Sequence, residues 1–271
     1  MGEFLLKKHK KSRKSFFIHF SFPSHLDVPR HSRPLRSHQE LVLHVVFSQA
    51  QANSKKMVLN CMRVSPRKTK TLHLVRHGHG VHNAVGEINY DDYKLECNED
   101  AALTELGLEQ CLSLSKAAQA ELKLGRIDAV LVSPMRRTLQ TAQHSFPALV
   151  GQVPWLALEC LREQTGQHPC DRRRPVTELS AAHSHVDFTR VLDDQDPLYW
   201  QYPNSREPSE HVLKRCQELI DLVMSNADLT EVVIVTHSAY LRHLLSILLP
   251  GEPPAEFHNC EMRSFVLACT E

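Results

Sequence analysis

The sequence Leu72-His73-Leu74-Val75-Arg76-His77-Gly78 decides the fold, because a hydrophobic, strand-forming run ends abruptly in charged side chains and a glycine. In the same way Ala129-Val130-Leu131-Val132 precedes Ser133-Pro134-Met135-Arg136-Arg137, and Val232-Val233-Ile234-Val235 precedes Thr236-His237-Ser238. Short apolar runs bounded in this way are typical of buried strands. We therefore expect three interior strands, each followed by polar side chains at its carboxyl end.

Strands and helices alternate from residue 71 onward, which is typical of a mainly parallel sheet with helices on both faces. We predict strands over residues 71–75, 127–132, 231–235 and 264–269. Helical length and apolar spacing predict helices over residues 104–124, 135–144, 210–224 and 239–249. The expected fold class is α/β, a three-layer α/β/α sandwich, formed by one domain over residues 71–271.

Length and composition exclude two broad classes of protein. A chain of 271 residues with 42% hydrophobic residues can bury a core, so it is not wholly disordered. No apolar run approaches the 18 or so residues of a membrane-spanning helix, so we expect a soluble protein without a membrane partner. The eight cysteines form no C-x-x-C pair, which favours structural thiols in a reducing compartment.

The first 70 residues differ in charge from the rest of the chain. They carry 15 Lys and Arg against 3 acidic residues, whereas residues 71–271 carry 17 against 28. We predict a basic, disordered extension, and three interpretations of residues 1–56 stay open: a transit peptide, an arm for nucleic acid or an anionic surface, or translated upstream sequence. We expect a cytoplasmic protein, or a plastid or mitochondrial one if a transit peptide is present. The basic run at residues 7–14 lacks interleaved aromatic side chains, so we expect no nucleic-acid partner.

The polar side chains after the three strands point to phosphate chemistry. In open α/β sheets ligands bind at the carboxyl ends of strands, so Arg76, His77, Arg137 and His237 are expected to converge. Such a group of cations is costly unless an anion lies among them. Arginine matches phosphate oxygens with a planar fork of donors, and a neutral imidazole can attack phosphorus. The residues thus predict phosphoryl transfer without a bound metal.

Four ordered motifs resemble those of the histidine phosphatase, or phosphoglycerate mutase-like, superfamily. Arg76-His77-Gly78 with Asn83 resembles its R-H-G-x4-N signature, and Leu103-Thr104-Glu105-Leu106-Gly107 resembles L-T-x-x-G. Residues 133–142 resemble S-x-x-x-R-x-x-Q-T-A, and Thr236-His237-Ser238 resembles the segment with the second histidine. The resemblance covers residues 71 to about 270 and implies the fold already expected from the alternation.

A closer resemblance is to plant-type phosphoglycerate mutase-like proteins. It lies in His168-Pro169-Cys170-Asp171-Arg172-Arg173-Arg174 and in Asn259-Cys260-Glu261-Met262-Arg263-Ser264. Authentic glycolytic mutases carry a different sequence where this chain has Leu161-Arg162-Glu163-Gln164-Thr165-Gly166. The resemblance therefore favours hydrolysis of a small phosphorylated metabolite, such as a sugar phosphate or a phosphoglycerate-like acid, over mutase activity.

The resemblance implies a role for each matching residue and no cofactor or metal. His77 would be the nucleophile, Arg76 and Arg137 would clamp the phosphoryl oxygens, and a cationic His237 would stabilise the transition state. Glu163 would act as general acid and then as general base.

Four further positions are expected to lie against the substrate. Gly78 would let the backbone approach closely, and Asn83 would support the nucleophile loop. Arg172 and Arg173 are expected to bind the rest of an anionic substrate. Composition alone fits equally well with arginines that are only exposed to solvent.

Three alternatives stay open. His73, His77, His79 and His82 could form a metal site, but no carboxylate or cysteine stands at ligand spacing. The enzyme could be an active mutase, or the chain could bind phosphate without turnover. The oligomeric state is not predicted.

Overall fold

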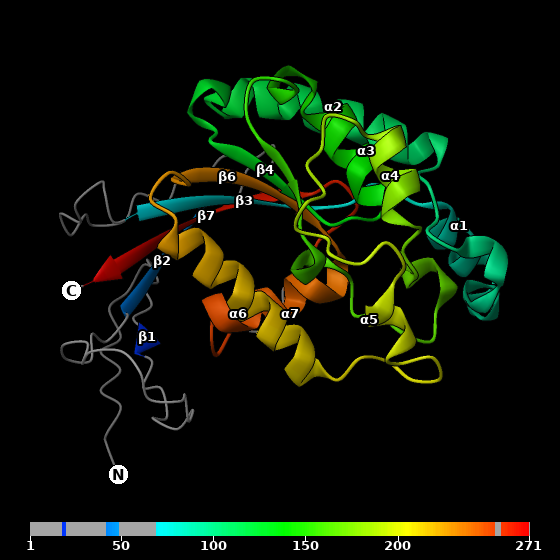
Figure 1. Cartoon of the computed structure of the whole chain (residues 1–271). Helices are drawn as coiled ribbons and strands as arrows, with labels where there is room; N and C mark the ends of the chain where they lie inside the picture. The colour runs from blue at the N-terminus through cyan, green and yellow to red at the C-terminus, as the bar shows by residue number, and fades with distance from the viewer. Residues whose placement is uncertain (1–17, 20–41, 49–68, 253–255, 271) are drawn as a thin grey trace, which may run out of the picture.

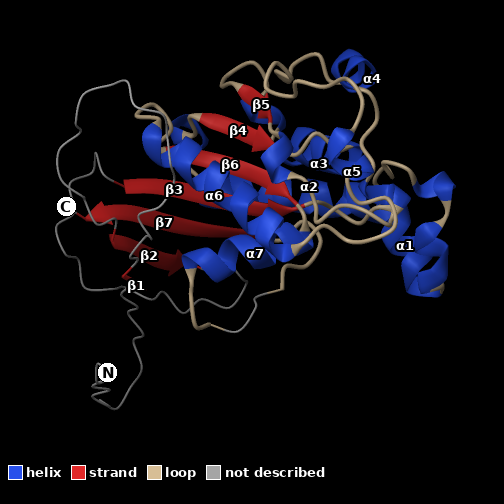
Figure 2. Ribbon diagram, turned by 60° about the horizontal axis from the view of Figure 1, so that its bottom comes forward, coloured by secondary structure: helices blue, strands red, loops and turns tan. Residues whose placement is uncertain are grey.

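The computed structural model describes residues 18–19, 42–48, 69–252 and 256–270. One sheet forms its centre, with the strand order β1-β2-β7-β3-β6-β4-β5 (Figures 1 and 2). The strands are β1 (Ile18–His19), β2 (Val42–Ser48), β3 (Thr69–Arg76), β4 (Ala129–Val132), β5 (Trp155–Ala157), β6 (Glu231–Thr236) and β7 (Met262–Thr270).

The predicted α/β fold class is confirmed, with a mixed sheet. β3, β6, β4 and β5 run parallel to one another, whereas β7 runs antiparallel to β3. The four predicted strands correspond to β3, β4, β6 and β7. β5 was not predicted, because three residues are too short to give a periodic pattern.

Helices cover both faces of the sheet (Figure 1). α2 and α3 lie on one face, and α6 and α7 lie on the other, as the predicted helices required. α1, α4 and α5 were not predicted, because they are at most eight residues long. The α-helices are α1 (Val81–Ile88), α2 (Glu105–Glu121), α3 (Arg136–Ser145), α4 (Val176–Ala182), α5 (Pro197–Trp200), α6 (Ser209–Ser225) and α7 (Ser238–Leu248).

Alternate side chains of the strands feed two separate cores. Leu131 and Ile234 pack with α6 and α7, whereas Val130 and Val233 pack with α2 and α3. Successive strand side chains point to opposite faces, and both faces here are covered by helices. This is why the strands are apolar without interruption, and why the sheet holds the residues at its ends rigidly.

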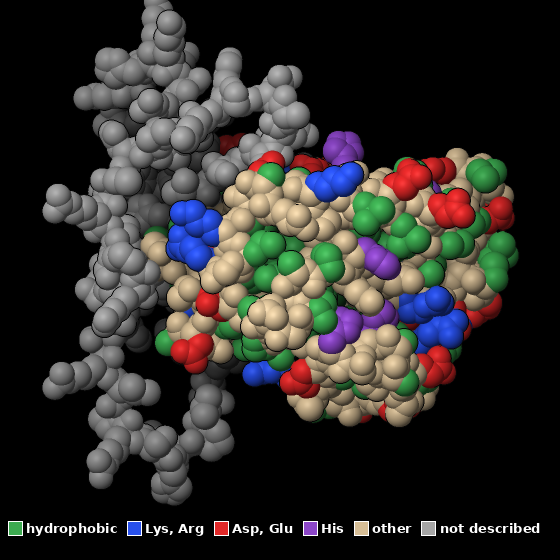
Figure 3. Space-filling view, turned by 90° about the horizontal axis from the view of Figure 1, so that it is seen from above, with side chains coloured by type: hydrophobic (Ala, Val, Ile, Leu, Met, Phe, Trp, Pro, Cys, Tyr) green, Lys and Arg blue, Asp and Glu red, His purple; other side chains and the backbone are tan. Residues whose placement is uncertain are grey.

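Short 3-10 helices occupy several connections, most of them near the carboxyl ends of the parallel strands. They are η2 (Tyr90–Lys94), η3 (Glu96–Asn98), η4 (Leu124–Arg126), η5 (Pro147–Leu149), η6 (Glu159–Leu161) and η7 (Pro169–Asp171). The face on which α2 lies carries hydrophobic side chains between small groups of acidic and basic ones (Figure 3).

Most of the predicted basic extension lies outside the described residues, so the three interpretations of residues 1–56 stay predictions. Two strands of the extension are described, β1 and β2, and β2 pairs with β7 in antiparallel register. No helix in the described part of the chain combines the length and apolarity needed to cross a bilayer.

Candidate active site

The carboxyl ends of β3 and β6 bring the predicted residues together. Their parallel register places Arg76 opposite Thr236, so His77 and His237 follow neighbouring strand ends. The rings of the two histidines lie edge to face, with centroids 5.2 Å apart. These ends point toward the side of the molecule that carries α1 and α5 (Figure 1). This is where open α/β sheets bind ligands.

His77 is held in one orientation by its own backbone. Its side chain is 2% exposed, and Nδ1 lies 2.7 Å from the carbonyl oxygen of Gly78. A carbonyl only accepts, so Nδ1 carries the proton and Nε2 keeps its lone pair. The backbone N–H of His77 donates to the Thr236 carbonyl at 2.9 Å, which fixes the loop to β6. The imidazole is thus prepared as a nucleophile at Nε2.

Position 78 needs a glycine because neighbouring atoms pack closely against it, and not because its φ is unusual. Its N–H donates to Thr141 Oγ1 at 2.9 Å, so that N–H already has a protein partner. A Cβ at this position would lie 3.0 Å from the Gly107 carbonyl oxygen and 3.1 Å from Cys260 Sγ. The close packing at Gly78 is thus against α2 and Cys260, and its contact with substrate stays a prediction.

Arg76 has one donor committed to the protein and one that is buried without a partner. Its Nη1 donates to the Phe257 carbonyl at 2.6 Å. Its Nε is buried and has no hydrogen-bond partner among the described residues. An unpaired buried donor is costly, and a phosphoryl oxygen is a suitable acceptor for it. Burial lowers the pKa of Arg76, and the nearby Glu163 opposes that shift.

Arg137 is fully buried and is oriented by three partners. Nη1 donates to the Cys170 carbonyl at 2.6 Å, Nη2 lies 3.2 Å from Asp171 Oδ1, and Nε donates to His237 Nδ1 at 3.3 Å. His237 Nε2 lies 2.8 Å from Ser133 Oγ. Because His237 Nδ1 accepts, this imidazole is neutral in the structure. The expectation of a cationic His237 is thereby corrected: the cation beside it is Arg137.

Burial and positive neighbours keep three imidazoles uncharged. Burial, followed by the charges of Arg137 and Arg76, lowers the pKa of His77 well below its usual value. Burial and Arg137 act in the same direction on the pKa values of His82 and His237. A neutral His77 is the nucleophilic form, so the surrounding charges favour its reactivity at neutral pH.

Glu163 lies at the amino end of α7, next to the histidines. Its Oε1 accepts from the backbone N–H groups of Gln164 at 2.9 Å and Tyr240 at 3.0 Å, and its Oε2 accepts from Ala239 at 3.2 Å. Helix amino ends present free N–H groups that bind carboxylates. Glu163 is therefore fixed beside the cluster that Arg76 and His77 form, as the sequence predicted.

Asn83 and His82 lie on α1, behind the nucleophile. Asn83 Oδ1 accepts from the Gly80 N–H at 2.9 Å, so it supports the loop before α1. The ring of His82 lies 5.5 Å from that of His77, and its Nδ1 is buried without a partner among the described residues. Tyr93 lies edge-on to His82 at 5.4 Å. His82 and Tyr93 were not predicted to adjoin the nucleophile, because the turn after Gly78 gives no periodic signal.

The two arginines predicted to bind substrate are committed to protein partners. Arg172 Nη2 donates to Glu96 Oε2 at 2.7 Å and to Glu99 Oε2 at 2.9 Å. Arg173 is 2% exposed; its Nε lies 2.6 Å from Glu159 Oε1, and its two Nη atoms donate to four backbone carbonyls. Both Nη groups of Arg173 thus have hydrogen-bond partners in the protein, and its Nε lies in an ion pair with Glu159. Its position corrects the prediction of a substrate contact, and Arg173 instead holds the segment 193–195 in place.

Arg206 and Asp171 were missed as site residues. Asp171 is buried between two guanidinium groups: Oδ1 faces Arg137, and Oδ2 lies 2.6 Å from Arg206 Nη1. Arg206 Nη1 also donates to the Gly166 carbonyl at 3.0 Å. Asp171 stands within a run of arginines and Arg206 in an irregular connection, so no local pattern marks either one.

The four neighbouring histidines do not converge on one point. His73 contacts Ser264 and Glu231, and His79 contacts Thr104 and Glu87. Within the described ranges, no group of His, Cys, Asp or Glu has the arrangement of a metal site.

The segment that contains this site is similar in sequence to known proteins. A family model described as histidine phosphatase superfamily (branch 1) matches residues 72–269. A phosphoglycerate mutase-like protein of Arabidopsis thaliana is 37% identical over 233 residues, covering 74% of this chain and 85% of its own. Phosphoglycerate mutase-like protein 1 of the same plant is 33% identical, with 74% and 82% covered. The predicted resemblance is confirmed.

Two solved structures are similar to this one. A putative alpha-ribazole-5'-P phosphatase of Escherichia coli has a TM-score of 0.49 and 20% identity, covering 72% of this chain and 89% of its own. A phosphoglycerate mutase of Bacillus anthracis has a TM-score of 0.48 and 17% identity, with 73% and 88% covered. Because the family model matches more than half of the sequence, including every residue of the nucleophile loop, the chain belongs to the histidine phosphatase superfamily.

Proposed function

We propose that this protein is a phosphomonoester hydrolase that works through a phosphohistidine on His77. One observation carries the proposal: His77 has its Nδ1 proton held by the Gly78 carbonyl, while two guanidinium groups surround the buried ring. That arrangement leaves Nε2 as a neutral nucleophile in a site built for an anion.

In the first step Nε2 of His77 attacks phosphorus, and the bond from phosphorus to the leaving oxygen breaks. Arg76 and Arg137 neutralise the charge on the phosphoryl oxygens. The buried Nε of Arg76, which lacks a partner among the described residues, donates to one of these oxygens. Glu163 enters this step protonated, with its oxygens still accepting from the α7 N–H groups, and gives its proton to the departing alkoxide.

In the second step water attacks the phosphohistidine. Glu163, now a carboxylate, takes a proton from the water, and the phosphorus–nitrogen bond breaks to release inorganic phosphate. Burial of His77 limits the access of other nucleophiles. The substrate that fits this scheme is a small phosphorylated metabolite, and no cofactor enters either step.

The test is phosphate release from a panel of phosphomonoesters by the wild-type protein and by His77→Ala. We expect the substitution to abolish release and acid-labile labelling by a radiolabelled substrate, a loss of at least about 10⁴-fold in kcat. His144→Ala, which changes an exposed histidine at the end of α3, is the matched control and should retain both. Labelling that survives in His77→Ala would overturn the assignment.

Mutase activity is the second candidate, because the relatives carry phosphoglycerate mutase-like names. Interconversion of phosphoglycerates that depends on a bisphosphate primer and exceeds phosphate release would favour it.

A further inference from the structure

Two thiols lie against the back of the nucleophile loop. Cys111 on α2 and Cys260 in the turn before β7 have their Sγ atoms 3.5 Å apart. A Cβ built on Gly78 would lie 3.1 Å from Cys260 Sγ and 3.4 Å from Cys111 Sγ. The sulfur pair therefore contacts the residue whose carbonyl orients the His77 imidazole.

Cys260 is also bonded to the loop through its backbone. Its N–H lies 3.1 Å from the Arg76 carbonyl oxygen and 3.3 Å from that of His77. The side chain of its neighbour Asn259 donates to the His77 carbonyl at 3.1 Å. A displacement of this turn is thus passed directly to Arg76 and His77.

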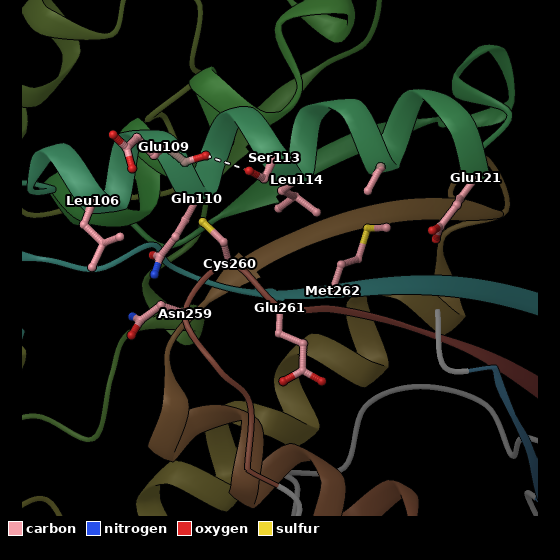
Figure 4. Close-up of a pocket in the computed structure, with 11 residues that line it drawn as sticks. Leu106, Glu109, Gln110, Ser113, Leu114, Glu121, Asn259, Cys260, Glu261 and Met262 are labelled. Atoms are coloured by element: carbon pink, nitrogen blue, oxygen red, sulfur yellow. Dashed lines mark hydrogen bonds between the residues drawn. The ribbon is translucent and has the colours of Figure 1, made fainter. Parts of the chain in front are cut away.

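A groove reaches Cys260 of the thiol pair. It has a volume of about 430 Å³ and lies between α2 and the start of β7, with Gln110, Asn259, Cys260 and Met262 among its lining residues. Figure 4 shows the Cys260 side chain pointing from the turn toward α2. Cys260 is 8% exposed and Cys111 is fully buried, so the groove reaches the pair on the Cys260 side.

We propose that Cys111 and Cys260 form an oxidation site for hydrogen peroxide, and that the resulting disulfide slows turnover by displacing the nucleophile loop. One sulfur attacks a peroxide oxygen; the O–O bond breaks, water leaves, and a sulfenic acid forms. The second sulfur then displaces a second water and forms the S–S bond. The two thiols lose two hydrogen atoms, and one peroxide is reduced to two waters.

The geometry of a disulfide explains the effect on the loop. The S–S distance must shorten from 3.5 Å to about 2.05 Å, which draws the turn at Cys260 toward α2. The hydrogen bond between the two thiols lowers the pKa of Cys111 against the opposing effect of burial and raises the pKa of Cys260, so the thiolate of the pair forms on Cys111. A displacement of about 1 Å of a reacting group can cost about 100-fold in rate. Formation of the bond is independent of the proposed function, whereas its effect on turnover rests on that function.

The experiment treats the full chain with hydrogen peroxide, blocks free thiols, and maps disulfides by mass spectrometry alongside phosphate release. We expect a Cys111–Cys260 linked peptide, a fall in kcat of between about tenfold and about 100-fold, and recovery with dithiothreitol. Cys97→Ser, which removes an exposed thiol outside the pair, should behave like wild type.

Two variants each remove one of the two sulfurs, so the test does not depend on either variant alone folding correctly. Cys260→Gly removes one sulfur and suits the left-handed φ of 55° at this position, and Cys111→Ala removes the other. Either variant should keep its activity after peroxide. No linked peptide in treated wild type, or a linked peptide with unchanged kcat, would overturn the proposal. A linked peptide in a wild-type protein that never releases phosphate would instead remove the proposed function and leave the oxidation site standing.

Discussion

At the scale of single residues, the site depends on uncharged histidines that are buried beside arginines. His82 is the clearest case, because its pKa is lowered by burial and by Arg137 although it makes no side-chain hydrogen bond at Nδ1 among the described residues. The unfolded chain binds a proton at this position below about pH 6.5, whereas the folded chain does not until the pH is lower. Proton uptake therefore favours the unfolded state in that interval.

We expect His82→Phe to reduce the loss of stability in acid. In the wild-type protein His82 contributes stability that is present above about pH 6.5 and is lost as the pH falls, with a slope of up to about 1.4 kcal/mol per pH unit. The measurement is the free energy of unfolding in urea at about pH 7.5 and about pH 5. His144→Phe, at an exposed position, should keep the wild-type slope. An unchanged slope in His82→Phe would show that His82 is protonated in the folded protein.

The residue scale also shows what the sequence could predict about the site. His77, Arg76 and Arg137 follow strand ends, so the alternation of the chain was enough to place them together. Arg172 and Arg173 are the same residue type at adjacent positions, and only contacts with distant segments distinguish their surroundings. Arg206 and Asp171 were missed for the same reason, since their partners are distant in sequence.

At the scale of elements, the residue that caps the amino end of α7 is also the residue proposed to transfer the proton. The N-cap residue of α7, His237, makes no side-chain capping bond, and Glu163 from another segment accepts from the second and third helical N–H groups instead. One carboxylate thus serves both the helix and the proposed proton transfer.

Glu163→Gln separates these two roles. The amide oxygen can still accept from the helix, so we expect the free energy of unfolding to fall by about 1 kcal/mol or less. The proton donor of the first step is lost, so kcat/KM for an alkyl phosphate, which reports that step, should fall by about 10²–10⁴-fold. The loss in kcat/KM should be much smaller for p-nitrophenyl phosphate, whose leaving group needs no proton. Equal losses in kcat/KM for both substrates would mean that Glu163 does not protonate the leaving group.

Elements with a long periodic pattern were the ones that the sequence predicted well. β3, β4, β6 and β7 and the four long helices were found within a few residues of their ends. β5 and α5 are three and four residues long, and their formation depends on neighbours rather than on their own pattern. The sequence predicted a mainly parallel sheet but not the antiparallel direction of β7, because the turn at residues 258–261 sets that direction.

At the scale of the whole molecule, buried ion pairs join segments that are distant in sequence. Arg215 on α6 lies 2.6 Å from Glu207 Oε2 and donates to the carbonyls of Cys160, Arg162 and Glu163. Arg215 therefore links α6 to the backbone of Glu163. Breaking such a pair leaves a buried charge without a partner.

We expect Arg215→Met to lower the free energy of unfolding by about 3–5 kcal/mol, because Glu207 is 1% exposed and would lose its counter-charge. The double variant Arg215→Met/Glu207→Leu should recover part of that loss, since neither charge then stays buried. Lys214→Met, at the exposed neighbouring position, is the control and should change little. Urea unfolding of the four proteins measures the loss and its recovery, and a double variant less stable than Arg215→Met would contradict the expectation.

The turn at Asn259 and Cys260 has a consequence for the time at which the protein becomes active in the cell. Asn259 completes the support of the His77 carbonyl from 182 residues further along the chain. A ribosome adds about 5–20 residues per second, so a delay of roughly ten to forty seconds separates the synthesis of the two partners. During that interval the nucleophile has been made but its loop lacks this support. The support of the His77 carbonyl is therefore completed only after this turn has been made and the strand that follows it pairs with β3.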